Sequence, residues 1–277
     1  MTGMHRAGPR WTAGSAGYRR AAIAACIAAA CVIDTAPASS ASPPSSIAAD
    51  RAVPFHVGEV LTYDVGWSGI VSAGRLVLSV RERRALGGGR AGYYCLAEAR
   101  PASLLERFYR VYYKADAVVN TTTLLPSLAS LYKDENGSIE NHITRFTGTK
   151  TIEYEQLTAA GSKRTRAVPP SSFDMLSAVY QLRTQNLKAG QPFVMNVINE
   201  GSLFHLQVAV TGPETIKTAL GTVSAWRLTP TITAENGEPA AAQDLTIWIS
   251  TDARRLPVRF QAGLPVGSFT LTLSSAK

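Results

Sequence analysis

The sequence predicts an all-β fold in which a single antiparallel sheet curls into a barrel-like or β-spiral domain, with one α-helix packed against it. Segments of alternating apolar and polar residues recur at spacings of about ten residues. Turn-forming pairs such as Asn136-Gly137 and Gly212-Pro213 separate these segments. One segment, at 172–184, instead spaces its apolar residues as a helix does. This combination is typical of antiparallel sandwiches and barrels.

Residues 1–38 are expected to be a secretory signal peptide. Arginines precede an apolar run from Ala21 to Ile33, and Ala36-Pro37-Ala38 offers small residues to a signal peptidase. The run is shorter than the roughly 20 residues of a membrane-spanning helix, so we expect no transmembrane span in the mature chain. The protein is therefore predicted to be exported to the periplasm. Cys31, which follows three alanines, offers the alternative of a lipoprotein anchored through that residue.

Residues 39–52 are rich in Ser, Ala and Pro and are predicted to form a disordered linker before a single β-rich domain at 53–277. The formal net charge is +8, part of which comes from the signal arginines. In an exported protein, the polyanions available to such a charge are lipid and lipopolysaccharide head groups rather than nucleic acid. Beyond residue 38 only Cys95 remains, so we expect no intramolecular disulfide.

The first half of the domain is expected to contain strands only. The segment 59–80 alternates on both sides of Gly69 and predicts two strands with a tight connection. Gly87-Gly88-Gly89 then predicts a turn, because no helix follows that would make it a phosphate-binding loop. Further strands are predicted at 91–100, 108–114, 127–132, 140–146 and 149–157.

The predicted helix at 172–184 follows Pro169-Pro170, and Ser171 or Ser172 is expected to cap it. Asp174 should stabilise its positive end. Arg183 should complement its negative end or pair with a residue of the sheet, and the alternative is that Arg183 contacts a ligand. The apolar stripe of this helix consists of Phe173, Leu176, Val179 and Tyr180.

After the helix, strands are predicted at 193–198, 203–210, 214–219, 222–229, 244–250, 256–261 and 268–273. The segment 245–260 is expected to form a hairpin with Asp252 and Arg255 in its turn. Asp252 should satisfy local backbone donors, and the arginine should bond back to it. Pro257 cannot donate to a ladder, so it predicts an edge or bulged position. Asp252 and Pro257 are thus predicted to shape the hairpin.

Several stretches, taken in order, resemble one known family. They are 57–63 followed by Trp67, then 173–183, then 247–258. This pattern is similar to the exported bacterial family called domain of unknown function 3108, and the resemblance covers nearly all of the chain after the signal. It implies an all-β fold with a helix and no assigned activity. More distantly, the hairpin is similar to those of periplasmic lipoprotein carriers and β-spiral proteins, whose concave face holds an acyl chain.

No catalytic, cofactor or metal motif is recognisable in the chain. His56, His142 and His205 each lack a second histidine at a ligand spacing, and no Gly-x-Ser-x-Gly elbow occurs. The sequence therefore assigns no catalytic residue, no cofactor and no metal ligand. A hydrolase whose site is assembled from scattered residues remains the alternative.

The sequence favours a non-catalytic binding or structural protein that holds an apolar envelope ligand or a protein partner. The expected partners are an envelope lipid, lipopolysaccharide or an envelope protein. Three basic clusters, at 81–84, 163–166 and 254–255, are expected at strand ends or turns, and would attract anions if they met on one rim. The candidate contact residues are Trp67, Tyr113, Arg183, Trp248, Arg254 and Arg255.

Overall fold

The computed structural model describes residues 49–277 except 109, 158–160, 241–242 and 265–266. The predicted signal peptide and most of the predicted linker lie outside these described residues. Asp50, at the end of that linker, contacts the side chains of Arg83 and Thr121. Within the described chain, no helix is long and apolar enough to cross a membrane.

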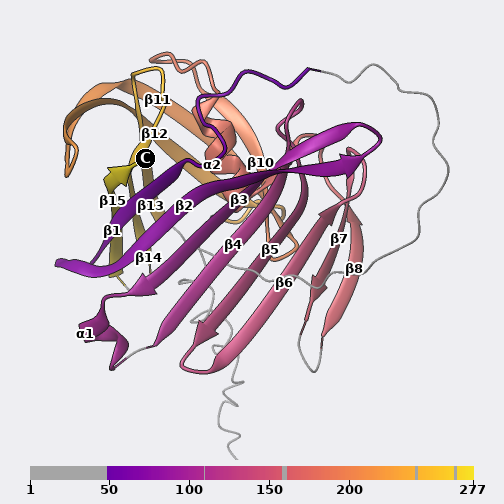
Figure 1. The fold of residues 1–277 in the computed structure, drawn as a ribbon, viewed down its shortest axis with the longest axis horizontal. Helices are drawn as coiled ribbons and strands as arrows, with labels where there is room; N and C mark the ends of the chain where they lie inside the picture. The colour runs from indigo at the N-terminus through magenta and orange to yellow at the C-terminus, as the bar shows by residue number, and fades with distance from the viewer. Residues whose placement is uncertain (1–48, 109, 158–160, 241–242, 265–266) are drawn as a thin grey trace, which may run out of the picture.

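A single 15-stranded sheet makes up most of the molecule and curls around one helix (Figure 1). From edge to edge its strand order is β8-β7-β6-β5-β4-β3-β2-β1-β15-β14-β13-β12-β11-β10-β9, and the two end strands do not pair with each other. The strands are β1 (Val60–Trp67), β2 (Ile70–Gly87), β3 (Arg90–Pro101), β4 (Val111–Asn120), β5 (Pro126–Glu135), β6 (Ser138–Phe146), β7 (Thr151–Gln156), β8 (Ser162–Ala167), β9 (Ser172–Asp174), β10 (Phe193–Asn199), β11 (Ser202–Thr218), β12 (Gly221–Ala234), β13 (Gln243–Ser250), β14 (Pro257–Leu264) and β15 (Gly267–Ala276).

The predicted fold class, a curled sheet with a packed helix, is confirmed. One detail was wrong, because the sheet is not purely antiparallel. β9 runs parallel to β10, with Phe173 opposite Val197. The sheet is therefore mixed, and it stays open instead of closing into a hydrogen-bonded barrel.

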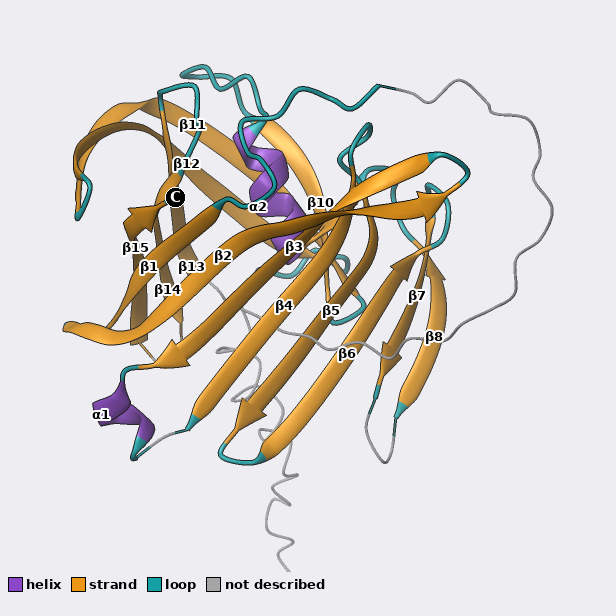
Figure 2. Cartoon of the chain, viewed as in Figure 1, coloured by secondary structure: helices purple, strands orange, loops and turns teal. Residues whose placement is uncertain are grey.

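The helix α2 (Met175–Arg183) lies inside the curl of the sheet (Figure 2). It begins later than predicted, because Ser172 to Asp174 form β9. Its N-cap is therefore Asp174 and not Ser171 or Ser172. The Asp174 carboxylate accepts from the backbone N–H groups of Leu176 and Ser177, and the Ser177 hydroxyl accepts from the N–H of Asp174. This reciprocal capping box fixes the first turn. A second, short helix, α1 (Ser103–Glu106), was not predicted.

α2 packs into two apolar clusters at once. Leu176 and Tyr180 belong to a cluster with residues of β1 to β4 and β13 to β15. Ala178 and Leu182 belong to a second cluster with residues of β10 to β13. The side chains of α2 thus occupy the space that the curled sheet encloses.

Three predictions about strands and charges needed correction. The basic segment 163–166, expected at a strand end or turn, lies within the edge strand β8. Residues 81–84 lie within β2 and not at its end. The predicted strands at 203–210 and 214–219 form one long strand, β11, whose register shifts between Val210 and Pro213. Proline has no N–H to donate, which accounts for the irregularity at that point.

Candidate functional site

Arg183 ends α2 and forms the most completely buried charged contact among the described residues. Its Nη1 and Nη2 lie 2.5 and 2.8 Å from the two carboxylate oxygens of Glu59. The guanidinium also donates to the carbonyl oxygens of Pro54, Arg254 and Arg255, each at 3.1 Å. Arg183 is 1% exposed and Glu59 5%. One side chain therefore joins the helix, the segment before β1 and the β13–β14 turn.

The β13–β14 turn is held by a chain of short hydrogen bonds. The backbone N–H of Leu256 donates to Ser250 Oγ at 2.7 Å, and this hydroxyl donates to Asp252 Oδ1 at 2.6 Å. The ionic partner of Asp252 is Arg254 at 3.1 Å, not Arg255. Burial opposes the charge of Asp252, but the bonds from Ser250 and Arg254 outweigh it and hold the pKa of the carboxyl below its ordinary value.

Pro257 lies directly after this turn, opposite Ile249 at a register shift between β13 and β14. β14 has neighbours on both sides, so Pro257 occupies a bulged position in the interior of the sheet. Its carbonyl oxygen accepts from the buried hydroxyl of Tyr63 at 2.8 Å.

The structure brings together only part of the set of candidate contact residues. Arg183 meets Arg254 and Arg255 through their backbone carbonyls. The aromatic candidates lie in other surroundings. Trp67 stacks on Phe269, the Tyr113 hydroxyl donates to Glu135, and Trp248 Nε1 donates to Glu214 at 2.9 Å.

Each of the three basic clusters has a carboxylate partner of its own. Arg83 pairs with Asp50, Arg166 with Glu235 and Arg254 with Asp252. These ion pairs partly neutralise the charge that the clusters would present to an anion.

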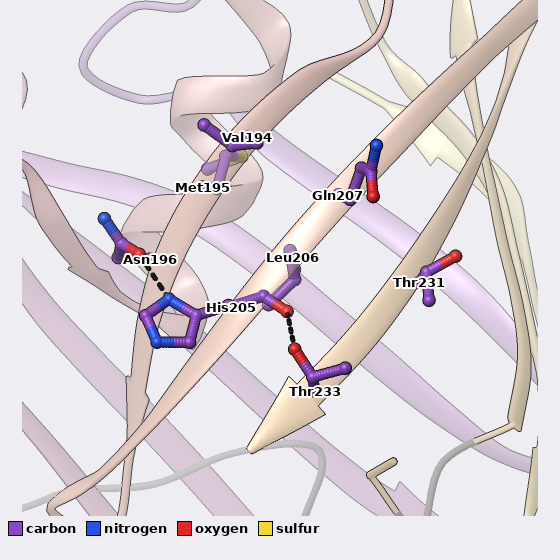
Figure 3. Close-up of a pocket in the computed structure, with 8 residues that line it drawn as sticks. All are labelled: Val194, Met195, Asn196, His205, Leu206, Gln207, Thr231 and Thr233. Carbon is purple, nitrogen blue, oxygen red and sulfur yellow. Dashed lines mark hydrogen bonds between the residues drawn. The ribbon is translucent and has the colours of Figure 1, made fainter. Parts of the chain in front are cut away.

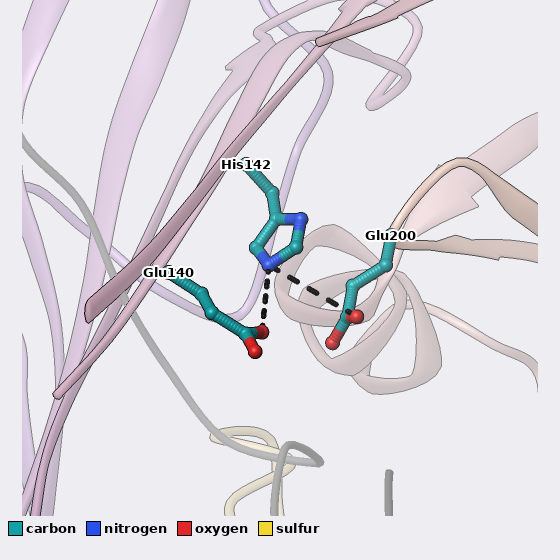
Figure 4. A group of neighbouring side chains, drawn as sticks. All are labelled: Glu140, His142 and Glu200. Carbon is teal, nitrogen blue, oxygen red and sulfur yellow. Dashed lines mark hydrogen bonds and ion pairs between the residues drawn. The ribbon is translucent and has the colours of Figure 1, made fainter. Parts of the chain in front are cut away.

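A second polar group, which we call the seam cluster, consists of Lys133, Glu140, His142 and Glu200 (Figure 4 shows the last three). Lys133 on β5 lies opposite Glu140 on β6. Glu200 comes from the turn between β10 and β11. Lys133 Nζ lies 2.6 Å from Glu140 Oε2 and 2.9 Å from Glu200 Oε1. His142 Nε2 lies 3.4 Å from Glu140 Oε2 and 4.0 Å from Glu200 Oε2.

Burial and the two carboxylates set the charges of the seam cluster. Burial opposes the charge of Lys133, but Glu140 and Glu200 outweigh it and raise the pKa of the ammonium. Burial lowers the pKa of His142 below its ordinary value of about 6.5, so the imidazole is neutral at pH 7. Its Nδ1 lies 2.7 Å from the hydroxyl of Tyr154, whose pKa burial raises to about 12.

The same region joins two parts of the sheet that no ladder connects. Arg164 and Arg166 of β8 donate to the backbone carbonyls of Glu200 and Gly201. Gly201 lies so close to the ring of Tyr154 that an added Cβ would come within 2.5 Å of Cγ. Apolar packing supports the contact between the β7–β8 region and the β10–β11 region, through a small buried cluster of Ile152, Val168, Ile198 and Leu203. Side chains thus close the curl where the sheet itself remains open.

Two hollows lie beside β10. One, of about 360 Å³, lies over β10, β11 and β12 (Figure 3). The other, of about 530 Å³, lies between residues 194–196 of β10, the segment 170–173 that leads into β9, and Gln181 and Gln185 at the end of α2. Val194 lines both and is 78% exposed. β9 pairs only with residues 196–198 of β10, so residues 193–195 extend beyond it.

Sequence reasoning missed both the seam cluster and these hollows. A local signal existed for part of the cluster, because Glu140 and His142 are two residues apart on one strand and so share a face. Nothing in the sequence near them indicated Glu200. His205, expected to stand alone, lies in the hollow of Figure 3 with its Nδ1 2.8 Å from Asn196 Oδ1.

Residues 62–274 match the family model described as "Protein of unknown function (DUF3108)". No curated protein matches the chain. Among solved structures, a beta-barrel-like protein of the domain of unknown function DUF1849 from Brucella abortus is 9% identical, with a TM-score of 0.51, covering 79% of this chain and 96% of its own. At this identity the likeness concerns the fold alone.

Two further structures are less similar. A candidate exported protein with a YmcC-like fold from Bacteroides fragilis has a TM-score of 0.35 at 10% identity, covering 83% of this chain and all of its own. A candidate lipoprotein from Parabacteroides distasonis has a TM-score of 0.32 at 11% identity, covering 81% of this chain and 97% of its own.

Proposed function

Since the chain belongs to the DUF3108 family, whose function is unknown, we propose a function from its own geometry: it is a non-catalytic, exported protein of the cell envelope that binds a protein partner on its outer surface. Export is part of this proposal and rests on the arginines and the apolar run that begin the sequence.

The observation that carries the proposal is the position of α2. A carrier of an acyl chain needs an apolar cavity that buries most of its ligand. Here the concave side of the sheet holds Leu176, Tyr180 and Leu182 of the helix, each at most 5% exposed. Arg183 and Glu59 lock the end of that helix in place. A filled interior favours a role for the outer surface over transport of a lipid.

The edge of β10 is the part of that surface best suited to a protein partner. Residues 193–195 continue past β9, and an exposed strand edge can accept another strand by backbone hydrogen bonding. The hollow of about 530 Å³ beside this edge leaves room for an extended segment. Val194 offers it an apolar contact. The partner that fits is a protein with an extended, unpaired segment.

Photo-cross-linking in the native cell tests this proposal. A photoreactive phenylalanine analogue at Val194 is expected to give one discrete protein adduct. The same analogue at Leu220, an exposed apolar residue at the β11–β12 turn, is the matched control and should not give that adduct. Val194→Lys should reduce complex formation without changing the melting temperature. Identical products from both positions, or none from position 194, would refute the proposal.

A further inference from the structure

We propose that Glu140, His142 and Glu200 form a binding site for a divalent transition-metal ion such as Zn²⁺, and that Lys133 competes with the ion for the two carboxylates. The three residues offer one ligand atom each, and these atoms lie within 4.8 Å of one another (Figure 4). This site is separate from the β10 edge, so the inference does not depend on the proposed function.

The spacing of the donor atoms suits a small cation. Zinc bonds of about 2.0–2.2 Å at tetrahedral angles place neighbouring ligand atoms about 3.4 Å apart. His142 Nε2 lies 3.4 Å from Glu140 Oε2 and 4.0 Å from Glu200 Oε2. To reach this spacing the Glu200 carboxylate has to move closer, and its side chain is 28% exposed. One imidazole and two carboxylates are a ligand set that zinc accepts.

Tyr154 supplies the outer contact that a ligating histidine needs. Its hydroxyl lies 2.7 Å from His142 Nδ1 and holds the ring so that Nε2 faces the carboxylates. When Nδ1 carries the proton and donates to Tyr154, the lone pair of Nε2 is free for a metal ion. His142 is 4% exposed, so its ring is held within the cluster.

Lys133 determines how tightly an ion can bind. Its side chain is 7% exposed, and its ammonium contacts both carboxylates and so occupies the position that a metal cation would take. Two carboxylates against one ammonium leave the cluster with one net negative charge, although Arg164 also approaches through the carbonyl of Glu200. An incoming divalent ion must displace the ammonium. Removing that ammonium should therefore strengthen metal binding.

An ion at this site would link β6 to the β10–β11 turn and so reinforce the side-chain contact that closes the curl. The free energy of metal binding then adds to the stability of the folded state. The stability of the side-chain contact that closes the curl would then depend on the metal concentration and on how well the ion competes with Lys133.

Isothermal titration of metal-stripped protein with Zn²⁺ tests the inference. We expect one site in the natural protein, and binding about tenfold tighter or more in Lys133→Met. His142→Gln should remove binding in both backgrounds. His205→Gln changes a histidine outside the cluster and should leave binding unchanged. Binding that survives His142→Gln, or that does not strengthen in Lys133→Met, would overturn the inference.

A spectroscopic measurement on the unaltered protein keeps the test independent of how well Lys133→Met folds. Co²⁺ bound by an imidazole and two carboxylates should give a visible absorption band that saturates at one ion per chain and disappears on adding Zn²⁺. A spectrum equal to that of aqueous Co²⁺ at saturating metal would contradict the site.

Discussion

Arg183 at the end of α2 and Glu59 immediately before β1 form a two-pronged ion pair that is shielded from solvent at the centre of the fold. Three backbone carbonyls also accept from the same guanidinium, so protein groups surround the pair. The pair fixes the helix against two segments that are distant in sequence, and it explains how a short helix stays inside a wide sheet.

Arg183→Met should leave the Glu59 carboxylate buried without its partner. Breaking a buried pair in this way costs about 3–5 kcal/mol of unfolding free energy. Arg254→Met, in which the lost side chain is 65% exposed, is the control and should cost no more than about 0.5 kcal/mol. Urea unfolding measures both. Equal losses for the two variants would show that the buried pair is unimportant.

In the β13–β14 turn, Ser250→Ala should cost more than Asp252→Ala. Without its hydroxyl, the buried N–H of Leu256 loses its acceptor, a loss of about 1–3 kcal/mol. Asp252→Ala removes only partly exposed contacts and should cost about 1 kcal/mol. Neither change should alter cross-linking at Val194. If Asp252→Ala kept its melting temperature yet lost the cross-link, Asp252 would contribute to partner binding and not to the stability of the turn.

Gly201→Ala should destabilise the protein more than Gly221→Ala. Both glycines have positive φ, +70° and +100°, so alanine is strained by about 1–2 kcal/mol at either position. Only at Gly201 would the new Cβ also meet the ring of Tyr154. Thermal unfolding should therefore show a larger loss for Gly201→Ala, together with faster amide exchange in the β10–β11 turn. Similar losses would argue against close contact at the seam.

The seam cluster predicts a pH dependence through Glu140. Burial opposes its charge, but Lys133 and His142 outweigh it, so the pKa of Glu140 in the folded protein lies below its ordinary value. A carboxyl with a lowered pKa contributes stability above its unfolded pKa of about 4.3 and loses this contribution as the pH falls through the folded pKa. The natural protein should exceed Glu140→Gln in stability at pH 7.

This difference should shrink on acidification below about pH 4. Urea unfolding of both proteins across this range, with a chelator present to exclude metal effects, measures it. If the stability difference between the two proteins stays constant or grows as the pH falls, the proposed contact between Glu140 and Lys133 does not stabilise the charged carboxylate.

The alternation of apolar and polar residues predicted most strands, because a sheet with one buried face places apolar residues at every second position of a strand. On β1, for example, Leu61 and Tyr63 face the core at 1% and 0% exposure. The edge strand β8 was missed because its sequence lacks this alternation. Its residues are exposed and basic, its backbone pairs with β7 alone, and it buries no face that would impose a pattern.

The start of α2 and the seam cluster depended on contacts across the fold. Ser172 to Asp174 have helical neighbours in sequence, yet pairing with β10 holds them extended until Asp174 caps the helix. Glu140 and His142 share a strand face because they are two residues apart. Glu200 comes close to them only because the whole sheet curls. No short-range pattern encodes that approach.

The central claim is that the protein's own side chains fill the curled sheet, so that it acts through its surface. Native mass spectrometry of protein purified from its own envelope tests this directly, and a denaturing spectrum of the same sample identifies any covalent lipid. We predict that the native mass, after subtraction of bound metal, equals the denatured mass. A stoichiometric acyl-chain ligand that appears only in the native spectrum would contradict the claim.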